Sequence, residues 1–345
     1  MAYTTINKST DYFNTKIYTG NYTSGHAITG VGFQPSLVWT KDRSDTSWHL
    51  LTDAVRGATK SVNSHQDNAE ILNTNHLQSF DSDGFTVGAS NALNQSGISN
   101  VAWNWKAGTT GSGTTTGSGT YKTYSYSVNT TSGFSIVKYK GNGTAGHTIP
   151  HHLGTVPQMY MVKKLSSTGD WYVYHHSFGA TKFNKLNAGD NPVTNSLWNN
   201  TAPTSTVFSI DNNSAVNGND EDYICYLFSE RTGYSKISSW SGNQNVNGTF
   251  IFTGMKPQYI LWKNITDTYG WYIIDATRDP YNVAGQYMYA NSNDAEATNA
   301  FLDILSNGFK IREAGGGSNH SGDEYMYLAF GQSLVGSNNV PCTAR

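Results

Sequence analysis

The sequence predicts an all-β protein made of three repeated β-sandwich-like, or jelly-roll-like, modules. Three observations support this prediction: the composition, one pattern that occurs three times, and repeated strand–turn–strand segments. Among the 345 residues, 13% are aromatic, only 13% are charged and 35 are glycine. Aromatic residues favour strands, whereas helix surfaces usually draw on Glu, Lys and Arg, so this composition is typical of a many-stranded β protein.

The repeated pattern starts with a Gly-Asn pair and continues with a proline, an apolar run and a lysine. The lysine follows the proline by six positions each time, and a tryptophan follows the proline by thirteen positions in the first copy and fourteen in the others. An aromatic strand ends each copy. Several features in the same order three times indicate three copies of one unit. The anchor residues are Pro35, Lys41 and Trp48, then Pro157, Lys163 and Trp171, then Pro257, Lys263 and Trp271.

Each part of the pattern has a local structural interpretation. Proline lacks an N–H group and fixes φ, so it suits the first residue of a strand. The run from Leu37 to Lys41 is largely apolar on both faces, which predicts a central strand covered on both sides. A polar turn and a second apolar run follow, as in a β-hairpin. Second hairpins are predicted over 79–87 and 302–312, and short helices over 53–60 and 294–300.

The composition also predicts the domain boundaries. Residues 107–120 are almost entirely Gly, Ser and Thr, which predicts a flexible linker. The modules then cover residues 1–106, 121–232 and 233–345, the last with a C-terminal tail. Because no such tract separates the second and third modules, we expect these two to pack together and the first to be more independent.

Several functional classes are disfavoured by charge and hydropathy. The formal net charge is −2, whereas a nucleic-acid-binding surface needs clustered cations. No apolar stretch is long enough for a membrane span, and the N-terminus lacks the apolar segment of a signal peptide. We therefore expect no nucleic-acid partner, no membrane insertion and synthesis in a cytoplasm. For the two cysteines, a buried free Cys225 and an exposed Cys342 are favoured over a disulfide.

The residues that could carry chemistry have simpler structural interpretations. The adjacent pairs His151–His152 and His175–His176 lack any metal-binding motif, so we expect no metal site there. The acidic run 220–222 is interpreted as a solvated turn, with a bound cation as the alternative. The chain has no nucleophile-elbow motif, although a carboxylate pair from different strands stays open. We predict no enzyme, no catalytic residue, no metal and no cofactor.

Tryptophan side chains suggest a different function, because exposed indole rings stack on sugar rings while neighbouring amides bind the hydroxyl groups. Trp48, Trp171 and Trp271 are candidates, but a tryptophan that recurs in every copy is expected in the core. The Trp198-Asn199-Asn200 turn occurs in one copy only. For this turn, a glycan-binding or host-binding site and a purely accidental occurrence are both open.

Long segments of the chain resemble an uncharacterised repeat family of tailed-bacteriophage virion structural proteins, common in marine phages including cyanophages and often described as tail-associated. The resemblance covers essentially the whole chain. It implies a structural component of the virion without catalytic residues. One departure is His152, at a position where the family pattern has glycine, and this puts the detail of that turn in doubt. The segments include GFQPSLVWTKDRS, FDSDGFTVG, VAWNWKAG, GFSIVKYKGNGTAGHTIPHHLG, ILSNGFKIR and VGSNNVPCTAR.

The resemblance implies a tail-associated fibre or host-adsorption component located in the virion. A capsid decoration or head-fibre protein that binds only other virion proteins is the alternative, and a glycan-active enzyme is a weaker one. Expected partners are other virion proteins and a host surface glycan or receptor. A chain with few charges has little to protect its strand edges from pairing, so we also expect a homo-oligomer, with a trimer favoured.

Overall fold

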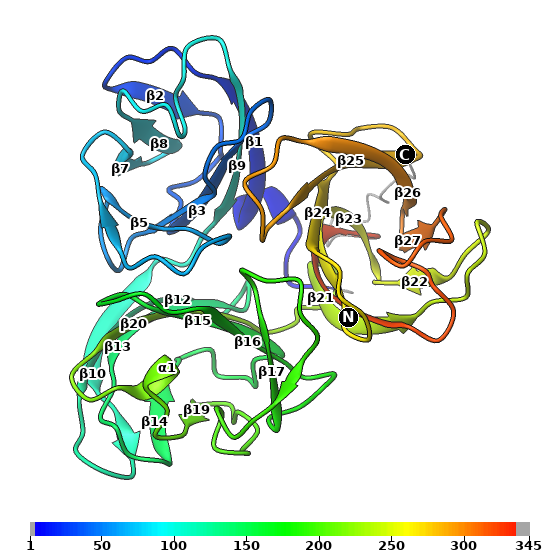
Figure 1. Cartoon of the computed structure of the whole chain (residues 1–345). Helices are drawn as coiled ribbons and strands as arrows, with labels where there is room; N and C mark the ends of the chain where they lie inside the picture. The colour runs from blue at the N-terminus through cyan, green and yellow to red at the C-terminus, as the bar shows by residue number, and fades with distance from the viewer. Residues whose placement is uncertain (1–3, 336–345) are drawn as a thin grey trace.

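The computed structural model describes residues 4–335 and confirms the all-β fold class. Strands make up 46% of the residues and helices 2%. Three groups of antiparallel strands lie around a common centre, coloured blue, green and yellow to red in Figure 1. The described helices are one turn of 3-10 helix, η1 (Ser9–Asp11), and one short α-helix, α1 (Ser214–Asn217).

The first module consists of a large sheet with the strand order β1-β9-β3-β4-β5-β6 and a small sheet with the order β2-β8-β7. The small sheet packs on one face of the large one through Ile28, Phe85 and Val38. The strands are β1 (Phe13–Thr19), β2 (His26–Thr29), β3 (Leu37–Asp42), β4 (Leu50–Asp53), β5 (Lys60–Val62), β6 (Ile71–Leu72), β7 (Leu77–Asp81), β8 (Gly84–Val87) and β9 (Ser99–Trp105).

The second module repeats this order and adds two strands at one edge of its large sheet. The large sheet reads β10-β12-β13-β20-β15-β16-β17-β18 and the small one β11-β14-β19. The strands are β10 (Thr109–Thr114), β11 (Thr116–Gly117), β12 (Thr123–Asn129), β13 (Phe134–Lys140), β14 (His147–Pro150), β15 (Met159–Lys164), β16 (Trp171–His175), β17 (Lys182–Lys185), β18 (Val193–Thr194), β19 (Val207–Ile210) and β20 (Asp222–Phe228).

The third module joins both layers in one sheet, ordered β21-β28-β23-β24-β25-β26-β27-β22, which is nearly closed like a barrel. Its first six strands correspond in order and pairing to the large sheet of the first module. The strands are β21 (Ser235–Ser241), β22 (Phe250–Phe252), β23 (Met255–Asn264), β24 (Trp271–Asp275), β25 (Ala284–Tyr289), β26 (Ala297–Leu305), β27 (Gly308–Ile311) and β28 (Glu324–Ser333).

The predicted strand after each proline is the centre of each module. In β3 all six residues are buried, and side chains alternate between the two faces. Leu37 and Trp39 point into one hydrophobic cluster, while Val38 lies in the core of its own module. The corresponding strands β15 and β23 alternate in the same way, so the prediction of strands covered on both sides is confirmed.

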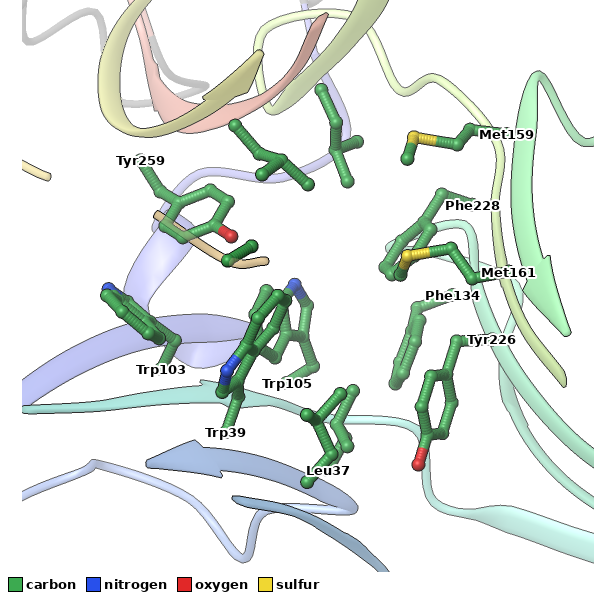
Figure 2. Packing of buried hydrophobic residues seen from close by; sticks show 14 of the residues in the cluster. Leu37, Trp39, Trp103, Trp105, Phe134, Met159, Met161, Tyr226, Phe228 and Tyr259 are labelled. Carbon is green, nitrogen blue, oxygen red and sulfur yellow. The ribbon is translucent and has the colours of Figure 1, made fainter. Parts of the chain in front are cut away.

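The cluster that contains Trp39 collects side chains from all three modules, and we call it the common core. Figure 2 shows how its rings and thioethers from different modules converge. Phe13 and Trp105 of the first module contact Phe330 of the third, with ring centroids 5.1 and 6.0 Å apart. The ring centroid of Trp105 also lies 6.5 Å from that of Phe228 of the second module. The modules therefore share one apolar interior.

Three expectations about the organisation of the chain are wrong. The tract 107–120 is not a flexible linker, because it forms β10 and β11. The first module is not independent, because it contributes to the common core. The predicted helices are absent: residues 54–56 form a turn after β4, and residues 297–300 belong to β26. In the first case, Gly111 and Gly113 leave room for the rings of Tyr126 and Tyr124 across the β10–β12 pair.

Tryptophan burial separates the first module from the others. Trp171 and Trp271 are 0% and 1% exposed, as expected, but Trp48 is 40% exposed. Extending the β3–β4 pairing by one residue past Thr40 and Leu50 brings His49, not Trp48, to the position that Trp171 and Trp271 occupy. His49 is buried there, and Trp48, one residue earlier and before β4, is exposed.

We predict that Trp171→Ala lowers the free energy of unfolding by about 3–5 kcal/mol, because it removes a buried ring from the common core. Trp48→Ala is the matched control and should change this free energy by no more than about 0.5 kcal/mol. Urea unfolding followed by circular dichroism measures both. Equal losses for the two variants would contradict the assignment of their environments.

Candidate functional site

The repeated lysines are structural. Lys41, Lys163 and Lys263 are all fully buried, and each ammonium group donates to backbone carbonyl groups. Lys163 Nζ, for example, lies 2.7 Å from the carbonyl oxygen of Gly169 and 3.1 Å from that of Asp67, which belongs to the first module. Burial lowers the pKa of each lysine to about 8, against the opposing effect of nearby carboxylates. Their recurrence therefore reflects the support of one loop in each module.

The module junctions contain buried polar contacts that run in a cycle. Asp53 of the first module accepts a hydrogen bond from Tyr226 of the second, at 2.9 Å. Asp275 of the third module accepts one from Trp103 of the first, also at 2.9 Å. At the equivalent position in the second module, the His175 ring contacts a backbone carbonyl group of the third. Both carboxylates also pair with a buried arginine three residues later, Arg56 or Arg278.

The histidine pairs hold local structure. His151 and His175 are fully buried, and burial lowers their pKa values to about 4 and about 3. His152 has a φ of 60°, in the left-handed region that favours glycine, and its ring stacks on Tyr126 with centroids 3.8 Å apart. The stacking compensates for a backbone conformation that is unfavourable for a residue with a Cβ.

The acidic run 220–222 is neutralised by lysines. Asp220 pairs with Lys122, Glu221 with Lys164, and Asp222 with both Lys138 and Lys140. These ion pairs leave no cluster of free oxygen ligands for a cation. Throughout residues 4–335, no group of three or more His, Cys, Asp or Glu side chains is arranged to hold a metal ion. Over the same range, no helix is long and apolar enough to cross a membrane.

The predicted Trp198-Asn199-Asn200 site is not available for stacking on a sugar. Trp198 is 0% exposed, and its ring lies at a steep angle to that of Tyr160, with centroids 4.9 Å apart. Asn199 and Asn200 have φ values of 52° and 49° and form the turn that follows. Trp198 is therefore part of the core of the second module. The two asparagines serve a tight turn, which asparagine tolerates better than most residues.

One buried asparagine recurs in each module, and the sequence analysis did not identify it. Asn94, Asn217 and Asn319 are each 0% exposed and bind the loop that starts with the repeated Gly-Asn pair. The glycine of that pair passes so close to the asparagine loop that a Cβ at Gly20 would lie 2.2 Å from the carbonyl oxygen of Gln95. The Gly-Asn pair is the half of this contact that the repeated sequence pattern contains. Its partner lies about seventy positions downstream in each module.

The exposed Trp48 lines a hollow of about 280 Å³ on the first module. One wall is the β3–β4 loop with Asp45, and the opposite wall is the segment after β8 with Asn91 and Gln95. The remaining lining residues are Thr46, Ser47, His76 and Ala92. Ser47 Oγ donates to the carbonyl oxygen of Ala92 at 3.2 Å, which ties the two walls together.

The polar groups of the hollow are partly committed to the protein. Oδ1 of Asp45 accepts hydrogen bonds from the backbone N–H and the hydroxyl group of Thr46. His76 is held by its Nδ1 contact with Ser61, at 3.2 Å, and burial lowers its pKa to about 4. It is therefore neutral at pH 7. An aromatic wall faced by a carboxylate, two amides and a neutral imidazole is an arrangement that can bind a small polar ligand.

These observations define the class of protein: an all-β chain in which three related modules share one core. Residues 8–333 match the family described as a domain of unknown function, DUF7483, and the chain belongs to this family. No curated protein and no solved structure matches the chain.

The remaining site predictions have simple outcomes. Cys225 is a buried free cysteine, and burial raises its pKa well above the usual value. Cys342 lies outside the described residues. Of the three recurring tryptophans expected in the core, Trp48 is the one that is not buried, and it lines the hollow. The signal was present in the sequence, since its distance from the proline is one residue shorter than in the other copies.

We predict that the free energy of unfolding rises between pH 8 and 9. The buried lysines release protons near pH 8, whereas unfolded lysines keep theirs to about pH 10.4. Stability increases with pH wherever the unfolded state binds more protons. The gain should be about 1 kcal/mol for each lysine over this unit. Cys225 acts in the opposite sense from about pH 8.5, where the unfolded thiol ionises and the buried one does not. One thiol offsets only part of the gain from three lysines.

Urea titrations at several pH values measure this effect. Lys263→Met should remove about one third of the slope, since one of three equivalent groups is lost. The exposed Lys8 supplies the matched control, and Lys8→Met should leave the slope unchanged. A stability that is flat or falling from pH 8 to 9 would contradict the prediction.

Proposed function

We propose that the chain is a non-enzymatic structural component of a tailed-phage virion, located in the tail and active in host adsorption. The observation that supports a structural role best is the common core. It joins all three modules into one body through contacts such as Trp105 with Phe228 and Phe330. A body whose three modules share one apolar interior suits a part that transmits or resists force. The proposed location in a virion rests on the resemblance of the repeats to virion proteins.

A second proposal is a decoration or head-fibre protein that binds only other virion proteins. One surface feature favours it: Phe250 and Phe252 are 44% and 59% exposed on β22, a strand at the end of its sheet. The equivalent strand of the second module, β14, is covered on that side by β11. An edge strand that exposes large apolar side chains tends to pair with another chain.

Electron microscopy of intact particles, with an antibody fragment against the chain, tests the location. Density at the tail is expected for the adsorption role, and density on the head surface would support the decoration role instead. A chain found in infected cells but in no particle would contradict both proposals. Turnover of a polysaccharide by the purified chain would contradict the structural role.

The predicted homo-oligomer, with a trimer favoured, belongs to the same proposal. A part of the tail has to match the symmetry of its place in the particle, and most such assemblies are closed and symmetric. We expect sedimentation at micromolar concentration to give three times the chain mass of 37.7 kDa. Phe252→Lys should weaken the association if the β22 edge takes part, whereas Leu72→Lys, at a site 70% exposed on the first module, is the control. A concentration-independent monomer would contradict the prediction.

A further inference from the structure

We propose that the hollow lined by Trp48 is a binding site for one neutral pyranose unit of a surface glycan. This inference rests on the adsorption role proposed above and names the ligand class and the site. It starts from the nine tryptophans, all of which lie in the described part of the chain. Eight are 5% exposed or less, and Trp48 is 40% exposed.

The exposed indole differs from the equivalent residues of the other modules. Strand pairing aligns Trp48 with Asp170 and with Gly270. Asp170 turns away to bind Lys185 at 2.7 Å and Asn187 at 2.8 Å. The lysines that support one loop in each module are the same residue in all three. Trp48 has no aromatic counterpart at its position and faces solvent, so it is not part of such a shared contact.

The space that the hollow occupies in the first module is filled in the third. In the third module, Tyr269 occupies the position of Ser47 and covers the facing segment. Its ring lies so close to Gly316 that a Cβ there would be 2.1 Å from the tyrosine hydroxyl oxygen. In the first module, the small Ser47 and the polar Asn91 leave this space open, with a volume of about 280 Å³. Relative to the third module, the hollow is open because a small serine stands where a tyrosine fills the space.

The chemistry of the walls selects the ligand class. A pyranose ring has a C–H face that packs on an indole, and the aromatic face carries the negative charge that C–H groups prefer. Asn91 and Gln95 supply amide donors and acceptors for hydroxyl groups, and Asp45 supplies an acceptor. The lining contains one acidic side chain, no Lys and no Arg, and burial lowers the pKa of His76 to about 4. An anionic sugar would find no cationic side chain in the lining to pair with, so the site fits a neutral one.

Fluorescence quenching tests the proposal on the intact chain. Acrylamide quenches exposed tryptophans, and here it should reach Trp48 alone. The probes are oligosaccharides of glucose, galactose, mannose and N-acetylglucosamine, with oligogalacturonate as the anionic comparison. We expect at least one neutral probe to abolish most of the quenching and the anionic probe to have no effect. Quenching that no neutral probe changes, or that the anionic probe reduces more strongly, would overturn the proposal.

Variants then assign the protection to the hollow. Trp48→Ala and Asn91→Ala should each weaken binding of that probe at least tenfold by calorimetry, with unchanged thermal unfolding. Tyr281→Ala removes another exposed aromatic ring, 78% exposed in the third module, and should change the affinity less than twofold. An affinity that survives Trp48→Ala would overturn the site. Because the particle location is measured separately, its failure and the failure of the hollow can be told apart.

Discussion

The common core is the contact on which the rest of the structure depends. In each module, the two central strands place one face against their own small layer and the other against the neighbouring modules. Trp103 and Tyr226 occupy equivalent positions in this second face. A module separated from its neighbours would expose a whole apolar sheet face to water, which costs about 25 cal/mol for each Å². The three modules therefore depend on one another to bury these faces, although each has its own sheets and its own second core.

Polar contacts at the junctions then fix how the modules meet. Apolar packing alone is weakly directional, whereas a buried carboxylate that loses its partners is strongly unfavourable. Asp275 accepts from Trp103 while the Arg278 guanidinium lies 5.4 Å from the same ring. Polar side chains also cover the edge of the sheet at β21. Glu230 accepts a hydrogen bond from the outward N–H of Ile237, and the His176 ring contacts the carbonyl oxygen of Ile237. In the second module, the equivalent edge is covered by β12 instead.

Local patterns in the sequence predict the strands of this fold but not the way in which its layers meet. The proline, apolar run and lysine identify β3, β15 and β23 because these features depend on neighbouring residues. The pairing of β10 with β12 could not be predicted, because it depends on glycines leaving room for Tyr124 and Tyr126 across the sheet. The prediction of a binding site at Trp198 was wrong for a related reason. Trp198 is buried by residues far away in the sequence, such as Tyr160, and such contacts can occur in one module only.

The repeats serve as an internal comparison for the site as well. Where the three modules agree, as at the buried lysines and at Asn94, a structural contact explains the agreement. Where they differ, the residue either makes a buried contact of its own, as His49 does, or is exposed, as Trp48 is. His49 takes the place of two buried tryptophans and accepts a hydrogen bond from Trp39 at 2.9 Å. Trp48 directly precedes this buried ring and is exposed, whereas the other eight tryptophans of the chain are buried. The same stretch of chain therefore gives the first module both a smaller core residue and an exposed indole.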